Sequence, residues 1–247
     1  MKIYIGIIIV LAFLSCKKAE DRRCLKFVGE DAERIIETDL DIDSLFLSDD
    51  LYYSLAQGNE TKIVLTGGEN LLSHIDVRIN NGGLSIENDN KCKFLRSYKN
   101  KINAKIYVDS ITYIYYEGSK KLTSIDTLRS NELRLIIRDG AGSADLTLVN
   151  GYTSAIVSNG FGDITLRGKT NYGFLHCNSN GFCDARMLNV DGWLNVFSNT
   201  VGVMKINANE TVLEATIKQS GNIEYVGTPI SSTVHLEGSG KVISLNN

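Results

Sequence analysis

The sequence predicts an all-β protein, a single-stranded parallel β-helix (solenoid) with coils of about 20 residues. The first observation is a near-repeat, which we call the echo: SNGFGD at residues 158–163 recurs as SNGFCD at 179–184. The second is that similar turns recur along the chain at intervals of about 20 residues, as in solenoids. These turns centre on Gly118, Gly140, Gly160, Gly181, Thr200, Gly221 and Gly238.

The third observation is that positions at a fixed distance from each turn form apolar columns. Four residues before the turns stand Ile114, Ile136, Ile156, Cys177, Val196, Ile217 and Val234. One residue later the column is mixed and contains Tyr115, Ile137, Val157, Asn178, Phe197, Lys218 and His235. Because side chains alternate between the two sides of a strand, we expect the first column to face the interior and the second to face outward.

Composition agrees with a strand-rich solenoid. Proline occurs once and glycine 22 times, while β-branched and aromatic residues are plentiful. The preferred hand of parallel crossovers predicts right-handed winding. An antiparallel sandwich or barrel with strands about 10 residues apart is the alternative, which the apolar columns disfavour.

The region before the first clear coil, residues 35–116, is less regular. Two strand-like stretches at 42–57 and 61–68 are separated by a turn at Gln57-Gly58-Asn59. ENLLSHI at 69–75 is the one short helix that we expect. DVRINNGGLSIEN at 76–88 predicts a hairpin with an Asn-Gly turn. No linker interrupts the chain, so residues 32–247 are expected to form one domain.

Residues 1–15 read as a signal peptide. Lys2 precedes an apolar run from Ile3 to Leu14, which is shorter than the roughly 20 residues that span a bilayer. Phe13-Leu14-Ser15-Cys16 resembles a bacterial lipobox, which implies cleavage before Cys16 and acylation of its thiol. The alternative is a cysteine that merely follows a signal peptide or a short anchor helix.

Residues 16–31 are expected to be a tether, because KKAEDRR is charged and nearly free of apolar side chains. Lys17, rather than an aspartate, follows the cysteine and points to the outer membrane. The same charged stretch fits either a surface-export tag or an ordinary solvated linker. The expected location is therefore the cell envelope, on the periplasmic side or at the cell surface.

The stretch GGENLLSHIDVRINNGGLSIENDNKCKFLRSYKNKINAKIYV at 67–108, followed by regular corners, resembles the GIN domain family. The resemblance extends over about 37–242, and NKCKFLRSYK is its most specific part. It implies a lipoprotein signal, a short tether and one β-helical head of an adhesin. It also implies that Cys24 and Cys92 pair as a disulfide; two free thiols are the alternative.

The remaining cysteines, Cys177 and Cys183, do not have zinc-site spacing. Cys177 falls in the inward column and is expected to be a small core residue. A bridge between the two is a second option.

Asp163 and Asp184 hold the same place in the two echoes and are the candidate ligand residues. On adjacent coils they would stand about 5 Å apart, a separation that suits a retaining glycosidase or a calcium site. The alternative is that each aspartate caps its own turn.

Tyrosines form a second candidate surface for sugars, with packing within the fold as the alternative. They are Tyr52, Tyr53, Tyr113, Tyr115 and Tyr116.

The sequence thus favours a lipid-anchored, non-catalytic module that binds a polysaccharide or protein ligand. The net charge of −3 argues against nucleic acid, and no cofactor or metal is expected. Two alternatives stay open: a carbohydrate-active enzyme and a structural envelope protein without its own ligand.

Overall fold

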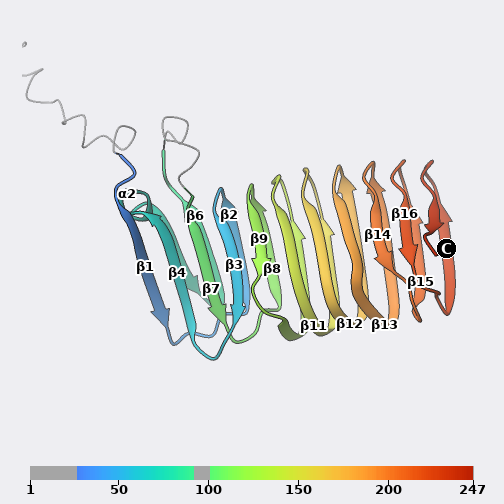
Figure 1. The fold of residues 1–247 in the computed structure, drawn as a ribbon, viewed down its shortest axis with the longest axis horizontal. Helices are drawn as coiled ribbons and strands as arrows, with labels where there is room; N and C mark the ends of the chain where they lie inside the picture. The colour runs from blue at the N-terminus through green and yellow to red at the C-terminus, as the bar shows by residue number, and fades with distance from the viewer. Residues whose placement is uncertain (1–26, 92–100, 247) are drawn as a thin grey trace, which may run out of the picture.

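Strands stacked along one axis make up most of the described chain in the computed structural model, which describes residues 27–91 and 101–246 (Figure 1). The N-terminal part contains β1 (Asp31–Thr38), β2 (Ser44–Asp49), β3 (Tyr52–Gln57), β4 (Thr61–Gly68), α2 (Glu69–Leu72), β5 (Ile75–Asn80), β6 (Gly83–Asn88) and β7 (Asn103–Val108). The regular coils contain β8 (Tyr113–Gly118), β9 (Lys121–Ser124), β10 (Leu128–Ile137), β11 (Ser143–Val157), β12 (Asp163–Ser179), β13 (Phe182–Thr200), β14 (Met204–Asn207), β15 (Val212–Ile217), β16 (Ile223–Val226), β17 (Ser231–Leu236) and β18 (Val242–Ser244).

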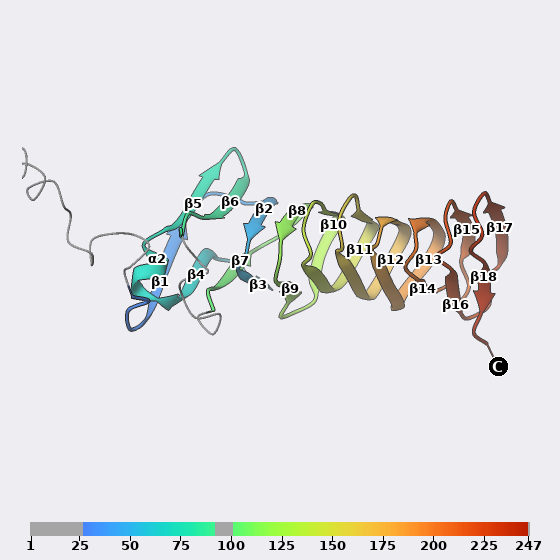
Figure 2. The ribbon, with the colours of Figure 1, turned by 90° about the horizontal axis from the view of Figure 1, so that it is seen from above.

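From β8 onward every pairing is parallel, which confirms the predicted β-solenoid (Figure 2). Strands β2, β8 and β10, the second halves of β11, β12 and β13, and then β15 and β17 form what we call the first face. Strands β3 and β9, the first halves of β11, β12 and β13, and then β14, β16 and β18 form the second face.

The interior is filled by one side chain of every two along each strand. On the first face the inward residues of successive coils include Leu135, Ala155, Leu175, Val196 and Ala215, each in register with the next and at most 1% exposed. Such stacking buries a continuous apolar core that no single coil could bury alone.

The predicted inward column was wrong at two coils. Ile136 and Ile156 face outward and are half-buried, whereas Ile137 and Val157 lie in the interior with no exposure. The predicted columns were counted from the turn glycines, but the corners differ in length. Val157 and Asp163 are partners of Cys177 and Phe182, so the corner at 157–163 is one residue longer than the corner at 177–182.

The extra residue separates the two copies of the echo, which start at Ser158 and Ser179, in their backbone conformation. Gly160 takes a left-handed φ of +99°, and a Cβ there would lie 2.6 Å from the carbonyl oxygen of Gly140. In the second copy Gly181 lacks this conformation and stacks under Gly162 instead. The two copies therefore have nearly the same sequence, but their equivalent residues are not partners in the strand register.

The N-terminal coils are stacked out of sequence order. Strand β2 lies between β6 and β8, and β3 lies between β7 and β9, all in parallel. The coil made by β2 and β3 is thus inserted between two coils that come later in the chain. The parallel ladder therefore begins earlier than the sequence suggested.

The N-terminal end is closed by antiparallel pairing, because β1 pairs with β4 and β4 pairs with β7. The expected short helix is present as α2, and β5 and β6 form the expected hairpin. Its turn residues Asn81 and Gly82 have φ values of 48° and 77°, as a two-residue type I′ turn requires. At the other end all six residues of β17 are exposed.

No helix in the described ranges is long and apolar enough to cross a membrane. The predicted signal peptide and most of the predicted tether fall within residues 1–26, outside the described residues.

Candidate binding face

Aromatic side chains gather on the outer side of the first face. The alternation of each strand turns their rings away from the interior, and register lines them up across neighbouring coils. One row holds Tyr152, Tyr172 and Trp193 on three successive coils. The other rings on this face are Phe46, Tyr113, Tyr115, Phe174 and Phe197, together with the imidazole of His176. We call this set the aromatic face.

The rings of the aromatic face contact one another in two clusters. Phe46 lies 5.8 Å from Tyr113 and 6.4 Å from Tyr115, measured between ring centroids. Farther along, His176 lies 5.8 Å from Phe174 and 4.4 Å from Phe197, in both cases with tilted ring planes. These contacts hold the rings in place. Tyr172 nevertheless keeps 53% of its surface exposed.

The environment of His176 favours its neutral form. Burial between two phenylalanines lowers the pKa of its imidazole, and a hydrogen bond to Asn178 opposes this effect. Asn178 begins a ladder of amides along the edge of the aromatic face. Asn199 donates to Asn178 at 3.0 Å, and Gln219 donates to Asn199 at 3.3 Å.

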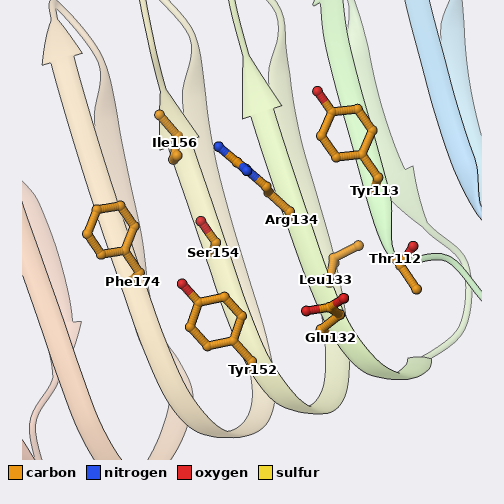
Figure 3. A pocket seen from close by; sticks show the side chains of 9 residues that line it. All are labelled: Thr112, Tyr113, Glu132, Leu133, Arg134, Tyr152, Ser154, Ile156 and Phe174. Carbon is orange, nitrogen blue, oxygen red and sulfur yellow. The ribbon is translucent and has the colours of Figure 1, made fainter.

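A depression of about 450 Å³ lies in the aromatic face where β8, β10, β11 and β12 run side by side (Figure 3). Tyr113, Tyr152 and Phe174 contribute rings to its lining, and Ser154 is the small residue between them. Glu132 and Arg134 add a carboxylate and a guanidinium. Neither takes part in a side-chain hydrogen bond or ion pair among the residues that the structure describes. The depression thus combines aromatic surface with charged hydrogen-bonding groups.

The second face is charged where the first is aromatic. Asp145 accepts hydrogen bonds from Lys121, at 2.9 Å, and from Arg167. Burial alone would raise the pKa of Asp145, but these two cations outweigh it and hold the pKa below its usual value. Such pairs neutralise charge within the surface itself.

The expectation that Asp163 and Asp184 stand opposite each other was wrong. Asp163 is the partner of Phe182, and Asp184 is the partner of Thr165, so the carboxylates are offset by two residues. Strand geometry then places their Cα atoms about 8 Å apart. The echo repeats after 21 positions, but the ladder steps by 20 residues before the corner and by 19 after it, so the difference in corner length supplies one of the two residues of offset. Both aspartates still line one depression of about 380 Å³ on the second face.

The two carboxyl groups have different environments. Burial raises the pKa of Asp163, against a backbone hydrogen bond from Phe182. Two hydrogen bonds from the guanidinium of Arg186, at 3.0 and 2.6 Å, lower the pKa of Asp184. Among the described residues, no group of three or more His, Cys, Asp and Glu side chains is placed to hold a metal ion.

Cys177 and Cys183 are free thiols inside the solenoid, 1% and 3% exposed. The expected core position of Cys177 is confirmed, and the alternative of a bridge to Cys183 is not what the structure shows. A hydrogen bond between the two thiols, aided by burial, raises the pKa of Cys183. Cys16, Cys24 and Cys92, the predicted lipidation site and disulfide pair, lie outside the described residues.

The tyrosines singled out in the sequence divide among three environments. Tyr52 lies on the second face, with the ammonium groups of Lys101 and Lys120 at 5.3 and 6.0 Å from its ring centroid. Tyr53 and Tyr116 are interior, with ring centroids 6.0 Å apart, and their hydroxyls donate to the carbonyls of Ser48 and Lys120. Tyr113 and Tyr115 belong to the aromatic face. The sequence analysis missed Tyr152, Tyr172 and Trp193, although their spacing of 20 and 21 positions carried the solenoid period.

Comparison with known proteins identifies the class to which this fold and surface belong. The family model described as "Putative auto-transporter adhesin, head GIN domain" matches residues 42–229. The chain belongs to this family of adhesin head domains, as the sequence resemblance implied. Membership indicates a protein of the cell surface or envelope.

Solved structures support the same fold. A "putative adhesin" from Bacteroides fragilis superposes with a TM-score of 0.78 at 20% identity, covering 87% of this chain and 97% of its own. A "putative adhesin" from Parabacteroides distasonis gives 0.65 at 16% identity, covering 88% and 98%. A "putative lipid binding protein" from the same species gives 0.61 at 17% identity, with 88% and 98% covered. No curated protein matches the chain in sequence.

Proposed function

We propose that the chain is a lipid-anchored, non-catalytic binding module that holds its ligand on the aromatic face. Membership in a family of adhesin head domains supports an adhesive role. The observation that carries the proposal is the concentration of eight aromatic rings and one imidazole on the outer side of the first face. The interior is already filled by other side chains, so folding does not require these rings on the surface.

The aromatic face suits an extended ligand. Its rows run along the solenoid axis, with about 4.8 Å between neighbouring coils. Solenoids use such long repetitive surfaces for binding. Lipidation of Cys16, which the signal peptide supports, would attach this surface to the outer membrane. The tether that follows would hold the module away from the bilayer.

The test is a binding assay on immobilised bacterial polysaccharides, host polysaccharides and matrix proteins, with released sugar measured in the same wells. We expect retention of the protein without release of sugar. A variant with Tyr152→Ala and Tyr172→Ala should lose retention. Phe182→Ala should leave retention unchanged, because it removes a ring from the second face that is about as exposed as Tyr172. Retention that survives the double variant would refute the location of the site.

A hydrolytic function on the second face is the second candidate, and the opposite pKa shifts of Asp163 and Asp184 favour it. A carboxyl group with a raised pKa suits a general acid, and its partner with a lowered pKa suits a base. Because the Cα atoms of the two aspartates lie about 8 Å apart, the wider carboxyl spacing of inverting glycosidases is the one to test, rather than the roughly 5 Å of retaining enzymes. If wild-type protein releases sugar and Asp163→Asn does not, this candidate replaces the binding module.

A further inference from the structure

Strands β11, β12 and β13 contribute outward side chains to both the first and the second face, and these two sets of side chains differ most in charge. On the first face, β11, β12 and β13, together with the residue that directly follows β11, present twelve outward positions, and none is Asp, Glu, Lys or Arg. These positions are Tyr152, Ser154, Ile156, Ser158, Tyr172, Phe174, His176, Asn178, Trp193, Asn195, Phe197 and Asn199. On the second face the same strands present Asp145, Asp163, Arg167, Asp184 and Arg186. This difference points to what the first face binds.

We propose that the ligand of the aromatic face is an uncharged polysaccharide, which lies along the solenoid axis with its sugar rings against Tyr152, Tyr172 and Trp193. This inference rests on the proposed function and names the ligand class of the same site. A charged polymer would have to leave water for a surface without compensating charges on these three coils, which is costly. His176 adds little to this balance, because burial lowers the pKa of its imidazole and favours the neutral form.

The side chains match the two kinds of surface that a sugar ring offers. The faces of aromatic rings carry partial negative charge, which attracts the weakly positive C–H groups on one side of a pyranose. Sugar hydroxyls need hydrogen-bond partners around the ring, and the amides of Asn178, Asn195 and Asn199 provide donors and acceptors beside the aromatic row. A purely apolar ligand would use none of the hydrogen-bonding capacity that these amides keep beyond their contacts with one another.

The geometry also fits a repeating chain. Tyr152, Tyr172 and Trp193 occupy equivalent places on successive coils, so the row spans about 10 Å. The depression at the start of the row has room for a sugar ring between Tyr113 and Tyr152. Glu132 and Arg134 also line the depression, and their opposite formal charges leave its lining without net charge. They can accept and donate hydrogen bonds to hydroxyls without favouring a charged ligand.

The experiment is affinity electrophoresis of the full-length protein, purified in detergent, through gels that contain a dissolved polysaccharide. The uncharged probes are hydroxyethyl cellulose, dextran and galactomannan, and the charged comparators are alginate and dextran sulfate. We expect retardation by at least one uncharged probe and none by the charged ones. Fibronectin and collagen are tested separately on a surface.

Variants at Tyr172 give the decisive comparison. Tyr172→Ala should weaken binding at least tenfold, which corresponds to about 1.4 kcal/mol, whereas Tyr172→Phe should retain binding because it keeps the ring. Phe182→Ala is the matched control, since its ring is 51% exposed against 53% for Tyr172 but lies on the second face. Melting temperatures of all three variants should match the wild type, which separates loss of binding from loss of fold.

Each other outcome overturns the inference. Retardation by the charged polymers alone, or by no polysaccharide, refutes an uncharged sugar ligand. If fibronectin or collagen binds instead and Tyr172→Ala abolishes that binding, the binding module stands and only its ligand class is wrong. If an uncharged probe binds equally well to Tyr172→Ala and wild type, the sugar site is not on the aromatic face.

Discussion

Replacement of Leu175 by alanine should destabilise the solenoid substantially. Leu175 is 1% exposed and stacks between Ala155 and Val196 of the neighbouring coils. The change removes three buried carbons at about 0.8 kcal/mol each, or about 2.4 kcal/mol. Ala155 is too small to fill the space, so a cavity adds to this loss and brings it to about 3–4 kcal/mol. For a domain of this size the melting temperature should fall by roughly 6–16 °C.

Ile156→Ala is the matched control, because it removes an aliphatic side chain of equal size from the outward side of the adjacent coil. Its cost should stay below about 1 kcal/mol, since a half-buried surface side chain leaves no cavity. Thermal denaturation followed by circular dichroism measures both variants against the wild type. Equal losses of melting temperature would refute the assignment of Leu175 to the interior and Ile156 to the exterior.

Three further predictions concern a corner, a histidine and the anchor. Gly160→Ala forces a side chain into a left-handed φ and should lower the free energy of unfolding by about 1–3 kcal/mol. Gly58→Ala, where a Cβ meets nothing within 4 Å, should leave the denaturation midpoint unchanged. Similar midpoints for both variants would contradict this reading. Because the pKa of His176 is lowered on folding, the folded state binds fewer protons than the unfolded state, so this contribution to stability is complete above pH 6.5 and declines as the pH falls. His176→Gln should therefore reduce the loss of melting temperature on acidification, and an unaltered pH profile would count against it. Cys16→Ser should abolish incorporation of a palmitate analogue during growth, and labelling that persists would exclude this cysteine as the lipidation site.

The sequence was sufficient for the solenoid because every coil repeats the same physical requirement. An interior position must be apolar in each coil, so the pattern survives even where individual residues differ. The pattern did not fix the register at Ile136 and Ile156. Gly140 and Gly160 follow the interior residues Ile137 and Val157 by three positions. Gly181 follows the interior residue Cys177 by four. Counting back four positions from each turn glycine therefore selects the wrong one of two adjacent apolar side chains in these two coils.

The candidate site was harder to predict, because the placement of the two aspartates and the placement of the aromatic rings both depend on that register. Asp163 and Asp184 hold the same place in the repeated sequence but are not partners in the strand register, so the expected pairing of the two carboxylates is absent. Tyr172 and Trp193 had the correct spacing, but a ring on a strand has the same periodicity whether it fills the core or meets solvent. Tyr116 and Tyr113 show this ambiguity within one strand, since the first is buried and the second faces outward.

The inserted coil of β2 and β3 has a consequence for how the chain acquires its structure. Ser44 pairs with Gly83 on one side and with Tyr113 on the other, so both edges of β2 stay open until residues far along the chain have been synthesised. Closing those long loops carries an entropy cost before any pairing compensates for it, which slows folding. The later coils can instead add one after another to an existing end. Formation of the N-terminal third should therefore be the slow, cooperative step, after which the aromatic rows assemble by rapid growth toward β18.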